Sequence, residues 1–315
     1  MRRALIIGID DYGDDSLAGC VNDANRIAAI LARHDDDAPN FTCKTLTAPA
    51  ERITRTMLRK QLEELFAQPA DAALFYFSGH GTANNLDGYV VTQDARAYDE
   101  GVAMSEILQR ANAAPIQEVV LILDCCYSGH LGNAPLAKND AALLREGVSV
   151  LTASRSTELS YETNGGGIFT SLVCDALTGG AADVVGHVTV SSLYAYVEQA
   201  LGAWDARPLF KSHVSRLLPL RQCKPSIALS TLRKLSTYFP LPDADFALDP
   251  SYEPLAEPHD EEHERIFGDL QKFRAARLLV PVDEEHMYFA AMHSKACRLT
   301  ASGRFYRHLA SDGKL

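Results

Sequence analysis

The chain alternates between short apolar runs and longer segments in which apolar residues recur at helical spacing. Continuous apolar runs of strand length, bounded by Gly, Asp or Ser, are typical of strands buried on both faces of a parallel sheet. We expect strands at Ala4–Ile9, Phe41–Leu46, Ala72–Phe77, Val119–Leu123, Val148–Thr152 and within Pro208–Leu220. These runs predict one central sheet.

Helices are predicted between these strands. In Leu17–His34, for example, Val21, Ala24, Ile27 and Leu31 fall on one face of a helix. The same pattern predicts helices at Leu17–His34, Ile53–Phe66, Met104–Ala113 and Val190–Leu201, and one that opens within Gly166–Thr170. A turn and a short hairpin are expected over Asn84–Asp94. Strands that alternate with helices predict an α/β domain.

Two of the predicted strands lead into residues that could take part in catalysis. Ala72–Phe77 leads into Ser78, Gly79, His80 and Gly81, and Val119–Leu123 leads into Asp124, Cys125 and Cys126. In an open α/β sheet, side chains beyond the carboxyl ends of neighbouring strands face one another. An imidazole beside a thiol supplies a base for a nucleophile. Taken singly, His80 would be an ordinary loop histidine and either cysteine a small buried residue.

The spacing also assigns roles within these loops. Residues i and i+2 of a strand share a side, so Cys126 is expected beside Asp124 and Cys125 on the opposite side. Glycines around His80 leave room for a substrate backbone, and Gly81 offers an unobstructed N–H to a developing oxyanion.

These segments resemble the caspase-like cysteine peptidases, closest to the metacaspase and paracaspase branch. The resemblance covers residues 4 to 220 and rests on S-G-H-G, D-C-C-Y-S-G, the block L-A-G-C-V-N-D-A and G-I-F-T. It implies a caspase-like three-layer α/β fold with a mostly parallel six-stranded sheet. It also implies an endopeptidase with His80 as base, Cys126 as nucleophile, and an oxyanion site made by the N–H groups of Gly81 and Cys126. Proteins or peptides would be its substrates.

Two acidic residues bear on specificity. Asp23 matches an aspartate that lines the pocket for the residue before the scissile bond in metacaspases, although capping of a helix is its alternative role. With Asp124 it would form a carboxylate pair that attracts a cation, so we expect cleavage after Arg or Lys. The resemblance further suggests autoprocessing in His130–Glu146, at Lys138 or Arg145, where a simple flexible linker is the alternative.

No metal or cofactor is expected. Metacaspases often bind calcium through clustered aspartates, but Asp87 and Asp94 make a thin set for an ion that takes six to eight oxygen ligands.

Composition narrows the setting. The 315 residues are 47% hydrophobic and 23% charged, as in an ordinary globular protein, and have seven scattered cysteines and no signal peptide. We therefore expect a cytoplasmic protein with reduced thiols. No apolar run has the roughly 20 residues that a membrane helix needs. A net charge of -11 argues against extensive nucleic-acid binding.

The composition changes after residue 223, so we expect a peptidase domain at 1–223 and a linker with a C-terminal accessory domain at 224–315. A proline-rich linker would lead to helices at Glu261–Arg277 and Leu299–Leu309, with strands at Leu278–Val282 and Met287–Ala291. This small α+β pattern weakly resembles a winged-helix fragment. Four residues have spacings that could suggest zinc: His259, His263, His293 and Cys297. The favoured interpretation is that the histidines are surface residues, because closed structural zinc sites usually show tighter cysteine pairing.

The last expectation concerns regulation. The C-terminal domain is interpreted as a sensor for a small anionic, nucleotide-like signal, since guanidinium groups and an aromatic face suit such a ligand. The candidate residues are Arg274, Arg277, Tyr288, His293, Lys295 and Arg298. Resemblance to bacterial caspase-like proteins with added domains suggests an effector of antiviral defence or cell death. The alternatives are a stabilising module, a catalytically weak scaffold and a winged-helix DNA-binding regulator, and the oligomeric state stays open.

Overall fold

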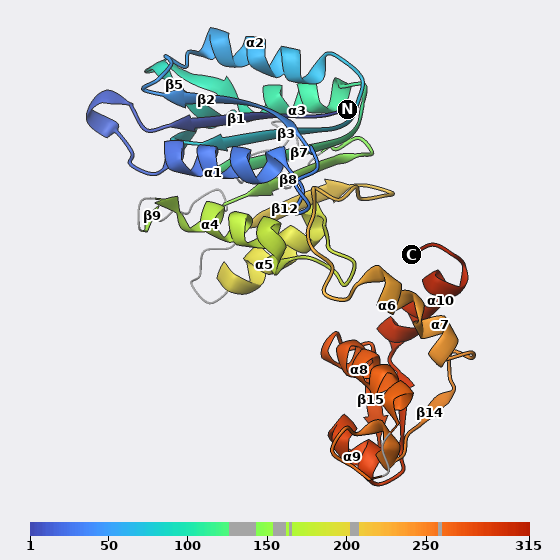
Figure 1. Cartoon of the computed structure of the whole chain (residues 1–315). Helices are drawn as coiled ribbons and strands as arrows, with labels where there is room; N and C mark the ends of the chain where they lie inside the picture. The colour runs from blue at the N-terminus through green and yellow to red at the C-terminus, as the bar shows by residue number, and fades with distance from the viewer. Residues whose placement is uncertain (126–142, 154–161, 164–165, 202–207, 258–259) are drawn as a thin grey trace. The chain divides into compact units, whose positions relative to one another are not determined.

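The computed structural model describes residues 1–125, 143–153, 162–163, 166–201, 208–257 and 260–315. The chain forms two compact units. The N-terminal unit contains Met1–Ala182 and His187–Lys224, and the C-terminal unit contains Asp183–Gly186 and Pro225–Leu315. Figure 1 shows the elements of each unit.

A six-stranded sheet organises the N-terminal unit, in the order β12-β8-β7-β3-β1-β2. Its neighbours pair in parallel except β12, which runs antiparallel to β8. The mostly parallel six-stranded sheet predicted from the sequence is therefore confirmed. The strands are β1 (Arg2–Ile9), β2 (Thr42–Ala48), β3 (Ala70–Ser78), β7 (Ile116–Asp124), β8 (Val148–Thr152) and β12 (Leu209–His213).

Helices cover both faces of this sheet and make three layers (Figure 1). One face packs against α1 (Cys20–Ala32), α4 (Ile168–Asp175) and α5 (Val190–Leu201), and the other against α2 (Arg55–Phe66) and α3 (Met104–Ala113). Successive residues of β1 enter opposite clusters: Ile6 joins the first and Ile7 the second. This alternation explains the continuous apolar runs, because both sides of each central strand are buried.

The predicted hairpin after β3 is larger than expected. It is a three-stranded antiparallel sheet of β4 (Gly81–Ala83), β5 (Gly88–Arg96) and β6 (Asp99–Ala103), on the same side of the main sheet as α2 and α3. Two short antiparallel pairs complete the unit: β9 (Glu162–Thr163) with β10 (Gly166–Gly167), and β11 (His187–Val188) with β13 (Arg221–Gln222).

The C-terminal unit has its own hydrophobic core, formed by Phe239, Phe267, Leu270, Phe273 and other buried residues. A small antiparallel sheet, in the order β14-β16-β15, lies among short helices. The elements are α6 (Leu229–Arg233), α7 (Leu235–Tyr238), β14 (Asp245–Ala247), α8 (Glu261–Ala275), β15 (Leu279–Val282), α9 (Met287–Met292), β16 (Ala296–Leu299) and α10 (Ala301–Ser311).

Two expectations for this unit are wrong. Met287–Ala291, predicted as a strand, lies in helix α9, and the strand that pairs with β15 is β16. The segment after residue 224 is also no plain linker, because α6, α7 and β14 belong to the unit and Leu232, Leu235 and Phe239 are in its core. The order of elements thus departs from the winged-helix pattern inferred from the sequence.

Candidate active site

The catalytic residues predicted from the sequence follow two neighbouring strands that end in register. Ser78, the last residue of β3, pairs with Asp124, the last residue of β7. Just beyond, the N–H of Gly79 donates to the Asp124 carbonyl at 3.4 Å. His80 lies two positions after Ser78, and Cys126 two positions after Asp124, but Cys126 is outside the described residues.

The imidazole of His80 is held by a backbone carbonyl. Its Nε2 lies 2.6 Å from the carbonyl oxygen of Asp15, in the loop between β1 and α1. A carbonyl oxygen only accepts, so Nε2 must carry the hydrogen of this bond. In the neutral ring the lone pair is then on Nδ1, which leaves that nitrogen as the base.

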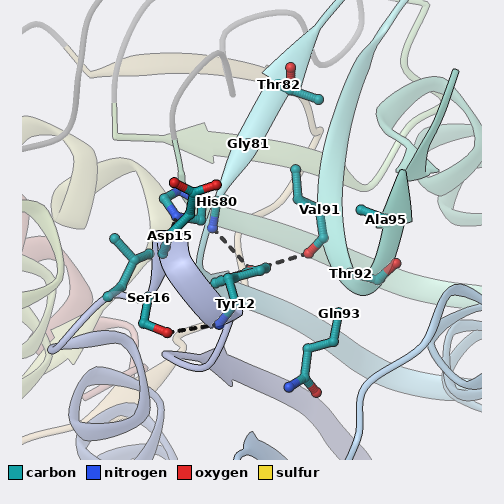
Figure 2. Close-up of a pocket in the computed structure, with 11 residues that line it drawn as sticks. Tyr12, Asp15, Ser16, His80, Gly81, Thr82, Val91, Thr92, Gln93 and Ala95 are labelled. Atoms are coloured by element: carbon teal, nitrogen blue, oxygen red, sulfur yellow. Dashed lines mark hydrogen bonds between the residues drawn. The ribbon is translucent and has the colours of Figure 1, made fainter. Parts of the chain in front are cut away.

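The backbone of His80 is held by Tyr12. The N–H of His80 donates to the Tyr12 hydroxyl at 3.1 Å, and the hydroxyl donates to the carbonyl of Val91 at 3.2 Å (Figure 2). Burial raises the pKa of Tyr12, so its hydroxyl keeps the proton for this second bond. The two rings lie 4.6 Å apart between centroids, inclined at 54°. Tyr12 therefore anchors the loop that carries His80.

The predicted oxyanion donor Gly81 begins β4. Gly81 pairs with Val90, and the adjacent bond runs from the Val91 N–H to the His80 carbonyl at 3.0 Å. In an antiparallel ladder this pattern makes Gly81 and Val90 a non-hydrogen-bonded pair, so the Gly81 N–H points away from β5. Its direction is compatible with donation to a substrate.

A cavity of about 510 Å³ lies beside His80 and Gly81 (Figure 2). Its wall also includes Tyr12, Asp15 and Gln93. The cavity is bounded by the loop after β1 on one side and by β4 and β5 on the other. His80 is therefore accessible from a hollow that is large enough for several side-chain or backbone groups.

The two acids predicted to bind substrate converge on Gly167 from different elements. A Cβ at Gly167 would lie 2.5 Å from Asp124 Oδ2 and 3.2 Å from Asp23 Oδ2. Asp23 is 1% exposed and accepts a bond from the Gly167 N–H at 2.7 Å. Asp124 is 6% exposed and accepts from the Thr170 hydroxyl at 2.6 Å. Gly166–Gly167 thus lets β10 approach two carboxylates where a side chain would collide with them.

Groups around these acids respond to their charge. Tyr76 is fully buried and its hydroxyl lies 2.6 Å from that of Thr170. Burial, and then the charges of Asp124 and Asp23, raise its pKa, which keeps it neutral. Arg26 approaches Asp23 at 3.6 Å and is 37% exposed. Among the described residues, two buried carboxylates thus lie close together, and Arg26 is a partly exposed cation beside them.

Arg145 and Lys138 are the two residues predicted as autoprocessing sites. Arg145 donates to the carbonyl of Ile116 at 2.7 Å, and its N–H donates to Asn112 Oδ1 at 3.0 Å, so both ends of the residue are held. Lys138 lies outside the described residues.

The aspartates weighed for calcium have structural partners. Asp94 accepts from the Arg55 N–H at 2.9 Å at the start of α2, and Asp87 accepts from the Gly88 N–H at 2.8 Å. Across the part of the chain that the structure describes, no group of three or more His, Cys, Asp or Glu residues could hold a metal ion.

The residues predicted to bind a ligand in the C-terminal unit are only partly available. Arg298 makes a two-pronged contact with Asp245 at 2.9 and 2.8 Å. His293 Nδ1 lies 2.8 Å from Glu284 Oε1 and its ring stacks on Phe289. Tyr288 is 46% exposed. Arg274 lies in the last turn of α8, Arg277 follows the helix, and Lys295 precedes β16.

Sequence reasoning missed residues that act through the backbone. Asp10 accepts from the N–H of Cys20 at 2.7 Å and so caps α1, although it lies ten residues away. Asp15 contributes only a carbonyl, which no side-chain pattern identifies. Tyr12 follows the predicted strand Ala4–Ile9 in the segment G-I-D-D-Y, and an aromatic residue with a hydroxyl just after a strand end was the available signal.

Comparisons with known proteins identify the family of the chain. A family model described as Caspase domain matches residues 1–233. Metacaspase-1 of Emericella nidulans is 28% identical over 173 residues, which are 46% of this chain and 40% of that protein. Metacaspase-1A of Neurospora crassa is 30% identical over 171 residues, 46% of this chain and 36% of that protein. The chain thus spans well under half the length of these relatives.

A solved structure shows the same fold. Caspase-1 from Spodoptera frugiperda superimposes with a TM-score of 0.51 at 14% identity, covering 72% of this chain and 92% of that one. Within the described residues, no helix is long and apolar enough to cross a membrane.

Proposed function

The chain belongs to the caspase-domain family, and from this membership we propose that it is a cysteine endopeptidase with Cys126 as nucleophile and His80 as base. The supporting observation is the arrangement around His80: its Nε2 is bound to a carbonyl, and its strand ends in register with the strand that precedes Cys126. Proteins or peptides would be the substrates.

The proposed mechanism uses both nitrogens of His80. Nδ1 takes the proton of the Cys126 thiol as the sulfur attacks the substrate carbonyl carbon. The bond from Nε2 to the Asp15 carbonyl stabilises the imidazolium that forms. The N–H groups of Gly81 and Cys126 would hold the oxyanion. Nδ1 then returns the proton to the leaving amine, which breaks the peptide bond, and water hydrolyses the thioester through the same base.

The assignment to Cys126 rather than Cys125 follows from strand alternation. Cys125 is 1% exposed and packs in the core cluster on the α2 and α3 side of the sheet. Asp124 faces the opposite side, where it meets Thr170 of α4. A residue two positions from Asp124 shares its side in an extended strand, which favours Cys126 as the thiol that serves the site.

We propose that cleavage follows Arg or Lys. Asp23 and Asp124 are buried and face the same point at Gly167, so a guanidinium or ammonium that enters would gain charge-assisted bonds in a setting of low dielectric constant. Caspases that cleave after Asp would need cations here. Arg26 is the described cation beside Asp23, and it is partly exposed.

One experiment tests the proposed activity. The purified chain, its Cys126→Ala variant and its His80→Ala variant are incubated with a peptide library whose members differ before the scissile bond, and with a thiol-directed activity probe. We expect cleavage after Arg and Lys by the natural chain alone and probe labelling that needs Cys126. A natural chain that neither cleaves nor reacts with the probe, with or without added nucleotides, would instead be a scaffold without catalysis.

Autoprocessing at Lys138 or Arg145 stays a proposal with unequal support. Cleavage at Arg145 needs its guanidinium to leave the Ile116 carbonyl and enter the acidic site, and its backbone to leave Asn112. These contacts argue for Lys138 as the site to test first, by the mass of fragments formed on activation.

We also propose that the C-terminal unit regulates the peptidase as part of a signal-activated effector in defence or cell death. Its separate core supports an independent role. An anionic, nucleotide-like ligand would bind through Arg274, Arg277, Tyr288 and Lys295, since Arg298 and His293 already contact Asp245 and Glu284. Calorimetric titration of the full chain with nucleotides tests this binding.

A further inference from the structure

We propose that Tyr12 is a positioning residue for catalysis, whose hydroxyl bridges the two strands beside His80 and thereby fixes the imidazole against Asp15. The inference rests on the proposed peptidase function, but its structural part can be tested separately. Tyr12 itself touches no reacting atom in this scheme, and it acts through His80.

The hydroxyl occupies the place of a direct backbone bond. The Val91 N–H donates to the His80 carbonyl at 3.0 Å, which makes these residues a hydrogen-bonded pair of an antiparallel ladder. In such a pair the return bond would run from the His80 N–H to the Val91 carbonyl. Here the Tyr12 hydroxyl lies between them, at 3.1 Å from the nitrogen and 3.2 Å from the oxygen. At His80, the two backbone segments are therefore separated by one hydroxyl group where a direct hydrogen bond would otherwise join them.

The space around the hydroxyl is specific to this arrangement. A Cβ at Gly79 would lie 2.5 Å from the Tyr12 oxygen, closer than such contacts occur, so the glycine next to His80 makes room for the tyrosine. Figure 2 shows the Tyr12 side chain reaching between His80 and Val91. A phenylalanine would fill most of this space and leave both backbone groups without the bridge.

The loop that carries Tyr12 also carries the group that holds the imidazole. Asp15 accepts from Nε2 of His80 at 2.6 Å, three residues after Tyr12. Ser16 ties the loop together, since it accepts from the Tyr12 N–H at 3.1 Å and donates to the Gly13 carbonyl at 2.8 Å. One loop thus binds His80 at two points, at its backbone and at its ring. Loss of the backbone point should let the ring shift relative to the nucleophile.

The test compares Tyr12→Phe with Tyr98→Phe in the full chain. Tyr98 is 98% exposed, so the control removes a hydroxyl without a comparable bridge. Because small misplacements of a catalytic group are costly, we expect Tyr12→Phe to lower kcat by about 10- to 100-fold, with KM changed less than about threefold. The control should match the natural chain. A loss confined to KM, or kcat within about twofold of the natural value, would overturn the assignment.

A second measurement does not depend on turnover. In the natural chain the Nε2 proton of His80 should give an NMR signal protected from exchange by its bond to Asp15. We expect Tyr12→Phe to broaden or lose this signal while the melting temperature stays within a few degrees. An unchanged signal overturns the positioning role. A chain that shows the effect on the signal but cleaves no substrate would sink the peptidase proposal and leave standing only the structural part of this one, the placement of the imidazole by Tyr12.

Gly79→Ala provides a coupling test. In the chain that keeps Tyr12, the added methyl group would lie too close to the Tyr12 oxygen, so we expect Gly79→Ala alone to lower kcat. Combined with Tyr12→Phe it meets no hydroxyl, so the double variant should be less impaired than the product of the two single effects. Multiplicative effects would contradict a direct contact between the two residues.

Discussion

At Asp23, the smallest change that tests specificity is the removal of one charge. Asp23→Asn keeps an oxygen that can accept from the Gly167 N–H, but it removes half of the buried acidic pair. We expect kcat/KM for a peptide with Arg before the scissile bond to fall about 100-fold, since a desolvated charge contact is lost. The measurement compares this peptide with one that carries citrulline, which has the same shape and no charge.

The citrulline peptide separates charge from shape. The natural chain should strongly prefer Arg, whereas Asp23→Asn should reduce that preference. Glu63→Gln is the matched control, because Glu63 is an exposed acid of α2, on the opposite side of the sheet. If both variants keep the natural preference for Arg, Asp23 does not read the substrate charge.

Cys125 and Cys126 should respond differently to the loss of their thiols. Cys126→Ala removes the proposed nucleophile and should abolish turnover. Cys125→Ala shortens a buried side chain, so we expect about 1 kcal/mol of lost stability with most of kcat retained. Parallel measurement of turnover and of urea unfolding decides the matter. Equal loss of turnover in folded variants would contradict the assignment.

At the scale of an element, strand β7 carries a buried ionisable group, Glu118, near its start, whereas the candidate active site lies beyond its end. Glu118 is 2% exposed, accepts from the Leu218 N–H at 2.8 Å, and has an oxygen, Oε1, without a hydrogen-bond partner among the described residues. Burial raises its pKa above the ordinary value of 4.5, against the opposing effects of the Leu218 bond and of Arg2.

This shift predicts the sign of a pH effect. Between the ordinary and the raised pKa, the folded state binds more protons than the unfolded state, so the contribution of Glu118 to stability falls as the pH rises. We expect the natural chain to lose stability relative to Glu118→Gln as the pH increases from about 4.5, measured by urea unfolding at each pH. Glu63→Gln, which removes an exposed carboxylate, is measured alongside as the control. A flat difference for Glu118→Gln would contradict the shift.

The parallel strands and the helices between them could be predicted because burial on both faces leaves a strong apolar pattern. Helix α9 could not be predicted as easily. Tyr288 and Phe289 favour strands, yet the buried residues Met287, Ala290 and Ala291 have helical spacing. The motifs identified His80, Asp23 and Asp124 as candidate site residues. The contacts of Tyr12 and Asp15 could not be predicted, because they depend on backbone geometry that only the tertiary structure supplies.

At the scale of the whole molecule, substitutions at two glycines should change the stability of the C-terminal unit without removing it. A Cβ at Gly303, in α10, would overlap the carbonyl oxygen of Leu278, whereas a Cβ at Gly268, in α8, has nothing within 4 Å. Gly303→Ala should therefore destabilise this unit by about 1 to 3 kcal/mol. Gly268→Ala should stabilise it by about 0.5 to 1 kcal/mol, as expected for alanine within a helix. Hydrogen exchange of α8 and α10 measures both changes.

The same pair tests regulation without truncation. A chain cut near residue 224 would lose the partners of Val184 and Val185, which pack with the C-terminal core, so its behaviour would mix regulation with exposed apolar surface. If the C-terminal unit restrains the peptidase, Gly303→Ala should raise basal cleavage several-fold and Gly268→Ala should leave it unchanged or lower. If the unit only stabilises the chain, Gly303→Ala should lower cleavage in proportion to the folded fraction. That second result would exclude restraint, because loosening an inhibitory unit should raise the activity of the molecules that stay folded above the natural value.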